Sequence, residues 1–242
     1  MGLPPFHAVG RTFVSGDRVK MLSPAVTPAT TGAGIISLIR ATADRPAMLG
    51  FSNSGGAGAW RIGRQATTSL LQIRNAAGAE AAHSSYQIPL NVPVVVMAYS
   101  AGDTEHYLAA GSAATLEKST TSVTLETVNA LHIGTSDNTS PIGNHTGQAF
   151  WIGALKALPP LDLLDQVLRQ VLPPTVLLPW LAHLIPLRGS PKEYCVVTRR
   201  ELTVDVGAPR STVGAPQPQI IEDEPAIGRL INRYRLVVSY GD

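Results

Sequence analysis

Short apolar runs recur along residues 34–158, separated by clusters of Gly, Asn, Ser and Pro. Most are rich in Ile and Val or alternate apolar with polar residues, which is typical of β-strands. They cover residues 34–41, 47–53, 59–65, 70–76, 86–90, 92–100, 105–111, 114–126, 130–136 and 148–158. Because no long amphipathic helix lies between them, the pattern predicts an all-β protein in which antiparallel sheets pack face to face.

Helical periodicity is clear in one segment, residues 161–172. Its apolar positions fall on one side of a helix and are Leu161, Leu164, Leu168, Val171 and Leu172. Prolines precede the segment at 159–160 and follow it at 173–174. Since proline is tolerated where a helix begins but interrupts its interior, these residues set the ends of an amphipathic helix of about three turns.

The next segment, residues 175–187, is apolar around its whole circumference. It is too short and too rich in proline for a transmembrane span, so it must be buried against protein. One interpretation is a helical hairpin packed on a sheet of the same chain. The other is a surface for a partner or a second copy, with Trp180 as its anchor. That surface would consist of Leu177, Leu178, Trp180, Leu181, Leu184 and Ile185.

The C-terminal part differs in composition from the rest. Residues 193–207 are predicted to form a strand, 208–219 a Pro/Gly-rich extended linker, and 228–242 a closing strand that contains Leu236, Val237 and Val238. An unpaired strand exposes a row of hydrogen-bonding groups, so we expect 228–242 to add to a sheet of a neighbouring chain. The predicted division is a sandwich over 1–172 and an assembly arm over 173–242.

Charge and cysteine content narrow the functional classes. Charged residues make up 15% of the chain and the formal net charge is +2, which gives no support for nucleic-acid binding by phosphate neutralisation. The single Cys195 lies in an apolar run, where we expect a buried, unreactive side chain. One cysteine cannot form an intramolecular disulfide, and the N-terminus lacks a signal-peptide pattern, so folding in a cytoplasm is expected.

The order of features over residues 92–172 resembles a known family. A central apolar strand (92–100) is followed by "HYLAAGS" (106–112). Then come a strand ending in Ile133-Gly134, a polar loop, a strand with Phe150-Trp151-Ile152-Gly153, and a short helix. This order resembles the concanavalin A-like, laminin G-like jelly-roll sandwiches, in particular those of tailed bacteriophages, over roughly residues 10–172.

The resemblance implies a structural accessory protein in the head or tail of a phage virion. Such a protein acts through assembly, so its partners would be other virion proteins and copies of itself. It would be folded in the cytoplasm of the bacterial host and located in the virion. The alternative is a lectin-like adsorption protein that binds glycan on the host surface.

Some sandwiches of this superfamily are glycosidases, which need two carboxylates on one face. The nearest arrangement is Asp103 and Glu105, two positions apart in a predicted loop tip. Because the row of acidic residues typical of the enzymes is missing, we predict no enzyme activity and no catalytic residues.

For glycan contact, the polar loop offers Asp137, Asn138 and Asn144. Their oxygens also suit calcium, but only one of the three is a carboxylate, and Asp and Asn are common turn formers. His132 and His145 have no tight ligand spacing, so no metal site and no cofactor are predicted.

Overall fold

The computed structural model divides the chain into two units, Met1–Ala208 and Pro209–Asp242. All the residues whose structure is described lie in the first unit. They are 10–13, 18–22, 26, 28–29, 31–43, 49–52, 58–64, 68–75, 79–126, 128, 130–134, 147–187, 192–197, 200–203 and 205–206. The predicted arm strand over 228–242, with Leu236, Val237 and Val238, therefore lies outside the described residues.

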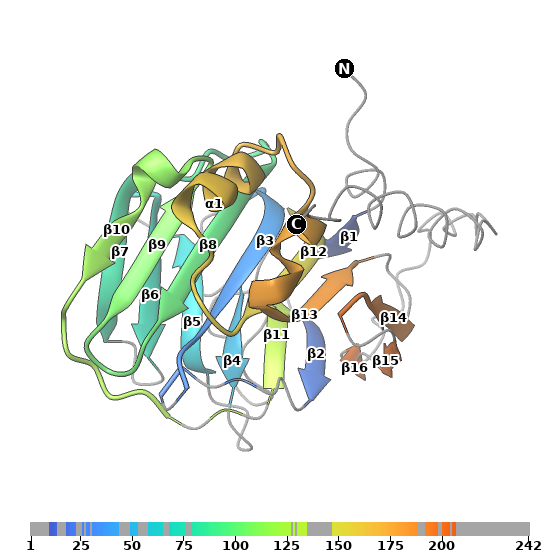
Figure 1. Ribbon diagram of the computed structural model, residues 1–242, viewed down its shortest axis with the longest axis horizontal. Helices are drawn as coiled ribbons and strands as arrows, with labels where there is room; N and C mark the ends of the chain where they lie inside the picture. Colours follow the sequence, from blue (N-terminus) through green and yellow to red (C-terminus); the bar gives the residue numbers. More distant parts are fainter. Residues whose placement is uncertain are drawn as a thin grey trace, which may run out of the picture. The chain divides into compact units, whose positions relative to one another are not determined.

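Most of the described residues belong to β-strands (Figure 1). The strands are β1 (Arg11–Phe13), β2 (Arg18–Leu22), β3 (Ala33–Ala41), β4 (Leu49–Ser52), β5 (Gly58–Arg64), β6 (Leu70–Asn75), β7 (Glu80–Gln87), β8 (Val94–Ser100), β9 (His106–Ala110), β10 (Glu117–Ser119), β11 (Ala130–Gly134), β12 (Gly147–Leu155), β13 (Leu181–Pro186), β14 (Lys192–Cys195), β15 (Arg200–Thr203) and β16 (Asp205–Val206). The helices are the 3₁₀ turn η2 (Ala113–Thr115), α1 (Leu161–Leu168) and the 3₁₀ helix η3 (Pro174–Trp180). Among the described residues, no helix combines the length and the apolarity needed to cross a membrane.

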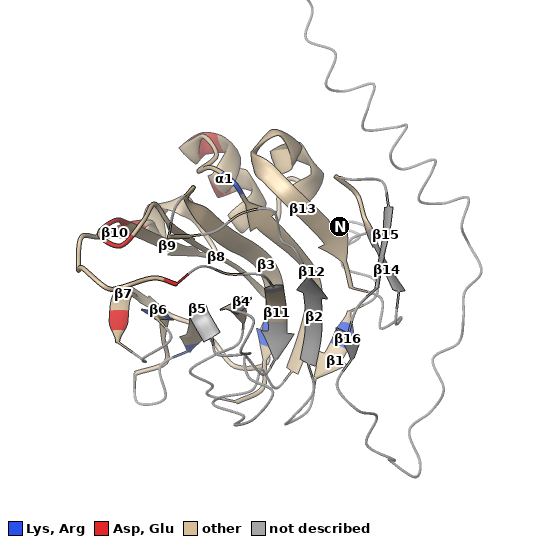
Figure 2. Cartoon of the chain, turned by 90° about the horizontal axis from the view of Figure 1, so that it is seen from below, with Lys and Arg blue, Asp and Glu red and all other residues tan. Residues whose placement is uncertain are grey.

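Two seven-stranded sheets form the body of the fold. The first has the order β1-β12-β3-β8-β9-β10, with β13 also paired to β12. The second has the order β16-β2-β11-β4-β5-β6-β7, and β14 and β15 form a separate small sheet. All the paired strands run antiparallel. Figure 2 shows the two large sheets as stacked layers, so the predicted all-β antiparallel sandwich is confirmed.

The core between the sheets follows from strict alternation along the strands. In β4 and β5, Leu49, Phe51, Trp60 and Ile62 face the first sheet and are fully buried. The rings of Phe51 and Trp60 lie 5.4 Å apart, a distance at which aromatic pairs stabilise beyond the area they bury. Because strand side chains alternate, the residues between them lie on the opposite face of the second sheet.

A second core covers the other face of the first sheet. All seven residues of β8 are buried, because Val94, Val96 and Ala98 face the second sheet whereas the residues between them contact α1 and η3. Burial on both faces explains why this strand is a continuous apolar run. Figure 2 shows α1 on the outer side of this sheet. Its buried residues are Leu164, Val167 and Leu168.

The segment after the helix corrects one prediction. Residues 174–186 are not a helical hairpin: η3 leads directly into β13, which extends the first sheet beside β12. Gly153 of β12 makes room for it, because a Cβ there would lie 2.9 Å from Leu181 Cδ2 and 3.0 Å from Ile36 Cγ2. Both distances are too short for a substituted residue without local movement.

Several predicted elements differ in extent. The helix ends at Leu168, so Val171 is 65% exposed, and Leu161 at its start is 58% exposed. The strand expected at 86–90 is instead β7, which begins at Glu80, and the run 114–126 contains only β10 as a strand. The single strand predicted over 193–207 is a hairpin of β14 and β15 followed by β16. Bulges in β12 place Phe150 and Leu155 against the second core rather than between the sheets.

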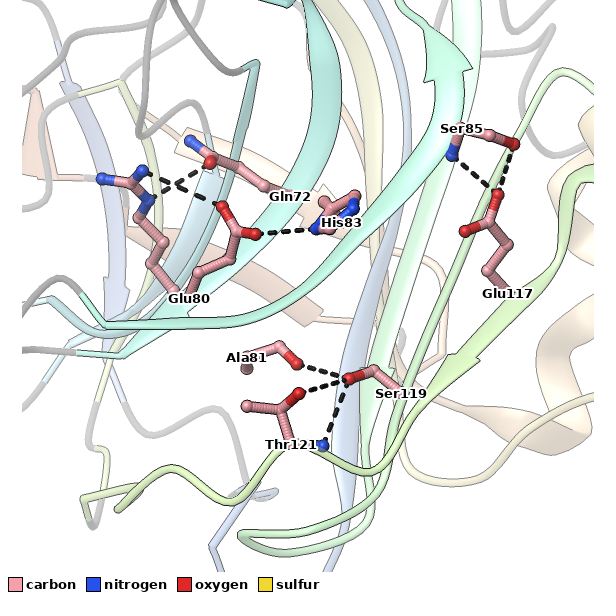
Figure 3. A network of polar contacts seen from close by, with 9 residues as sticks. Gln72, Glu80, Ala81, His83, Ser85, Glu117, Ser119 and Thr121 are labelled. Carbon is pink, nitrogen blue, oxygen red and sulfur yellow. Dashed lines mark hydrogen bonds and ion pairs between the residues drawn. The ribbon is translucent and has the colours of Figure 1, made fainter.

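Polar contacts connect the edges of the two sheets. The backbone N–H of Ser85 on β7 donates to Glu117 Oε1 on β10 at 2.7 Å, and Ser119 Oγ on β10 donates to the carbonyl of Ala81 at 2.7 Å (Figure 3). These bonds join strands that belong to different sheets. They satisfy edge groups that would otherwise be free to pair with another chain.

The helix α1 is held by one carboxylate. Asp165 accepts hydrogen bonds from Ser112 Oγ (2.8 Å) and from the N–H of Ala113 (2.7 Å), and its other oxygen pairs with Arg169 at 2.8 Å. The bonds from Ser112 and Ala113 hold the pKa of Asp165 below its ordinary value. The helix is therefore attached to the turn after β9 by polar bonds as well as by its apolar face.

Candidate functional site

The outer face of the second sheet carries a row of polar side chains across β5, β6 and β7. The register places Arg61 opposite Arg74, Gln72 opposite His83, and Arg74 opposite Glu80. Their apolar neighbours in the strands face the inter-sheet core, so alternation directs these side chains to the other face. We call Arg61, Gln72, Arg74, Glu80 and His83 the polar row.

Direct contacts connect four members of the polar row. Arg74 Nε donates to Gln72 Oε1 at 3.2 Å, and Arg74 Nη2 lies 3.9 Å from Glu80 Oε2. The other Glu80 oxygen lies 2.7 Å from His83 Nδ1 (Figure 3). The guanidinium, amide, carboxylate and imidazole are thus held side by side, and each is a planar group with hydrogen-bonding atoms at its edge.

Exposure varies strongly along the polar row. The His83 side chain is 58% exposed, and the side chains of Arg74 and Glu80 are both 30% exposed. In contrast, Arg61 is 6% exposed and Gln72 only 1%. The row therefore extends from solvent at His83 towards buried groups near the middle of the sheet.

Arg61 has no counter-charge among the residues that the structure describes. Among the described residues, no carboxylate forms an ion pair with it, and its Nε is buried without a hydrogen-bond partner. Burial lowers the pKa of Arg61, and the charge of Arg74 lowers it further. Gln72 Nε2 is another buried donor that has no acceptor among the described residues. Buried donors without acceptors are costly, and native proteins contain few of them.

Next to the polar row, Gly50 of β4 lies between Arg61 and His132 in the register. The His132 ring is buried against Gly50, because a Cβ at that position would lie 2.9 Å from His132 Cε1. The missing side chain at Gly50 therefore leaves room for the imidazole. Among the described residues, no group of three or more His, Cys, Asp or Glu side chains could hold a metal ion.

The predicted carboxylates have structural contacts. Asp103 Oδ1 accepts from the N–H of Leu125 at 3.0 Å, and its carbonyl accepts from the N–H of Val123 at 2.9 Å. Glu105 pairs with Lys118 at 2.9 Å and accepts a hydrogen bond from Tyr107, and these contacts lower its pKa. Asp103 thus fixes a loop, and Glu105 belongs to a surface ion pair.

The predicted apolar surface needs a correction. Leu177, Leu181 and Leu184 are buried in the second core, and Ile185 is buried between the sheets. All four side chains are at most 3% exposed, so a partner cannot contact them. Leu178 and Trp180 are half-buried. The predicted glycan-contact residues Asp137, Asn138 and Asn144 lie outside the described residues.

Cys195 is buried, as predicted, and its Sγ lies 3.6 Å from Nδ1 of the buried His183. The polar row was missed from the sequence. The alternation of Arg61, Gln72 and Arg74 with apolar residues was visible in their strands, but the partner strand was not. Residues 80–85, "EAAHSS", contain no β-branched or aromatic residue, so propensity did not indicate β7.

Comparison with protein families and with curated protein sequences yields no match for this chain. Solved structures do match. A proposed carbohydrate-binding protein from Bacteroides ovatus superposes with a TM-score of 0.54 at 12% identity, over 86% of this chain and 60% of that protein. What this chain shares with that protein is the fold, in which two antiparallel sheets pack as a jelly-roll sandwich. The chain thus spans about 60% of the length of the Bacteroides protein.

Two further structures were matched at lower similarity. The heptameric SAP-like pentraxin of Limulus polyphemus has a TM-score of 0.47 at 10% identity, over 66% of this chain and 78% of the pentraxin. Domains LG4-5 of the mouse laminin α1 chain have a TM-score of 0.43 at 13% identity, over 60% of this chain and 40% of the laminin chain.

Proposed function

We propose that this chain is a lectin-like module that binds glycan on the outer face of its second sheet, through Arg74, Glu80 and His83, with the buried Gln72 holding Arg74 in place. The observation that carries the proposal is the polar row: four planar groups held in contact on one face, with exposure rising towards His83. Sugar hydroxyls both donate and accept hydrogen bonds. An edge of alternating donors and acceptors is therefore complementary to them.

The fold supports this proposal over the assembly hypothesis. The Bacteroides ovatus protein that shares the fold is itself a proposed carbohydrate-binding protein. The assembly hypothesis relied on an apolar surface, and four of its six members in residues 175–187 are buried within the chain. A role in a phage virion stays a prediction from the sequence resemblance, and a glycan-binding module is compatible with it.

The test measures glycan binding by the whole chain and by single-site variants. A glycan array identifies ligands, and titration calorimetry then compares His83→Ala and Arg74→Ala with the original chain. Because each variant removes direct hydrogen bonds, we expect affinity to fall about tenfold or more. Gln166→Ala, an exposed polar residue of α1, is the matched control and should not change affinity.

Two outcomes would contradict the proposal. If no glycan on the array binds, the chain is not a lectin-like module. If glycan binds equally well to His83→Ala and Arg74→Ala but not to Asn138→Ala, the site is the predicted loop and not the polar row.

A further inference from the structure

The outer face of the second sheet places two arginines directly opposite each other. Arg61 of β5 and Arg74 of β6 form a cross-strand pair, so their Cβ atoms are separated by about 5 Å. Like charges in such a pair repel and destabilise a sheet. Neither side chain is free to leave the face, because Arg61 is buried and Arg74 is bonded to Gln72.

The charges of the described residues do not balance at this pair. Glu80 is the carboxylate in contact with Arg74, at 3.9 Å, and its other oxygen is used by His83. No carboxylate among the described residues forms an ion pair with Arg61. Among the described residues, this pair of guanidinium groups therefore has one carboxylate in contact, and the buried Arg61 has no counter-charge. A buried charge without a partner is strongly unfavourable, so this arrangement calls for an anion.

The chemistry of the donors specifies the kind of anion. A guanidinium presents N–H groups in a planar fork that matches two oxygens of a carboxylate or a sulfate. One such group between Arg61 and Arg74 would, together with Glu80, balance the two positive charges, and it could accept hydrogen bonds from both arginines at the same time. Gln72 Nε2 is a further buried donor on this face that has no acceptor among the described residues. The more exposed Arg74 is the side of the pair that solvent reaches.

We infer that the ligand is an acidic glycan, whose carboxylate or sulfate group binds between Arg61 and Arg74. This inference rests on the proposed function, since the rest of the sugar would occupy the polar row. A neutral sugar would leave Arg61 without a counter-charge, whereas an acidic sugar supplies it. Attraction of both arginines to the shared anion would then offset the repulsion between them.

The experiment titrates the whole chain with three probes at constant ionic strength: glucuronate, glucose and inorganic sulfate. We expect glucuronate to bind at least tenfold more tightly than glucose. Arg61→Gln should abolish that preference. Arg74→Gln, at a more exposed position, should reduce the preference and keeps the test possible if Arg61→Gln does not fold. Lys156→Gln removes an exposed positive charge after β12 and should keep the preference. Glu80→Gln should strengthen glucuronate binding, because it frees Arg74 from a competing carboxylate.

The outcomes separate the inference from the proposed function. If glucose and glucuronate bind equally and His83→Ala weakens both, the lectin-like function stands and the acidic specificity is wrong. If sulfate binds as tightly as glucuronate, the pair is a site for a free anion, which also overturns the acidic-glycan inference. A preference for glucuronate that persists in both arginine variants places the anion elsewhere and has the same consequence.

Discussion

A buried polar chain crosses the core between the sheets, and Ser100→Ala tests it. Trp60 Nε1, on the second sheet, donates to Ser100 Oγ at 2.7 Å. His106 Nε2 lies close to two carbonyl oxygens, which can only accept, so in the neutral ring Nδ1 accepts from the Ser100 hydroxyl at 2.8 Å. His106 Nε2 then carries the proton and donates to the carbonyl of Thr121 at 3.1 Å. Each side chain is completely buried.

The loss of stability expected for Ser100→Ala depends on how many buried groups are left without a hydrogen-bond partner. Removing the hydroxyl leaves the Trp60 N–H without an acceptor and His106 Nδ1 without a donor. Each unsatisfied buried group costs about 1–3 kcal/mol, so Ser100→Ala should reduce the free energy of unfolding by about 2–6 kcal/mol. Since domains are typically stable by about 5–15 kcal/mol, the variant should still fold at neutral pH.

Ser37→Ala is a matched control on the adjacent strand β3. Ser37 is equally buried, but its hydroxyl makes a single bond, to the carbonyl of Trp151 at 2.6 Å. Its removal leaves one group without a partner, so Ser100→Ala should be the more destabilising by about 1–3 kcal/mol. Urea unfolding followed by tryptophan fluorescence measures both variants. Equal losses, or a larger loss in Ser37→Ala, would refute the proposed chain of hydrogen bonds.

The hydrogen bonds through His106 also predict that the free energy of unfolding depends on pH. Burial lowers the pKa of His106 below its ordinary value of 6.5, although bonds to the carbonyls of Thr121 and Asp103 act in the opposite direction. In the unfolded chain the imidazole binds a proton near pH 6.5, whereas the folded chain binds it at a lower pH. The contribution of His106 is therefore complete above about pH 6.5 and declines as pH falls towards the folded pKa. His106→Gln should flatten this part of the stability profile, and an unchanged slope would contradict the assignment.

Two further predictions concern the C-terminal third of the chain. Leu177→Ala should cost about 2–5 kcal/mol in a urea melt because Leu177 is buried in the second core, whereas Leu161→Ala, at an exposed position, should change stability by about 0.5 kcal/mol or less. If the two variants lost equal stability, Leu177 would not be a core residue and could belong to the predicted partner surface. A chain truncated after Gly207 keeps every described residue and should still melt cooperatively. If residues 228–242 pair with a neighbouring chain, the truncation should lower the mass measured by light scattering, and an unchanged mass would exclude that role.

The strands could be predicted from the sequence wherever the pattern of apolar residues along a segment determines its structure. Strands such as β3, β5 and β8 were predicted within one or two residues, because their apolar runs match the burial they experience. The prediction failed where tertiary packing decides instead. Residues 181–186 form a strand because β12 offers an edge and Gly153 leaves room for Leu181. The pattern of apolar residues within a segment does not show which strand will lie beside it.

The candidate site was beyond sequence reasoning for a related reason. The polar row consists of residues on three strands that only the register brings together. Arg61 and Arg74 lie on neighbouring strands, thirteen positions apart in the sequence, and each is next to an apolar residue of its own strand. The informative property is that Arg61 is buried and has no counter-charge within the described part of the chain. Burial of a polar residue on a strand cannot be deduced from its neighbours in the sequence alone.

The placement of α1 and η3 also explains why a binding face would form on the second sheet. A two-sheet sandwich has two outer faces, and here the first sheet uses its outer face to pack a second apolar core under α1 and η3. Side chains on that face are selected for burial, so they cannot also be arranged around a ligand. On the second sheet, the polar row replaces such a core across β5, β6 and β7. Its residues contribute little apolar area, and Arg61 carries an electrostatic cost that packing alone does not explain. A bound anion would offset that cost, so the proposed acidic-glycan site would give the two arginines at these positions a physical role.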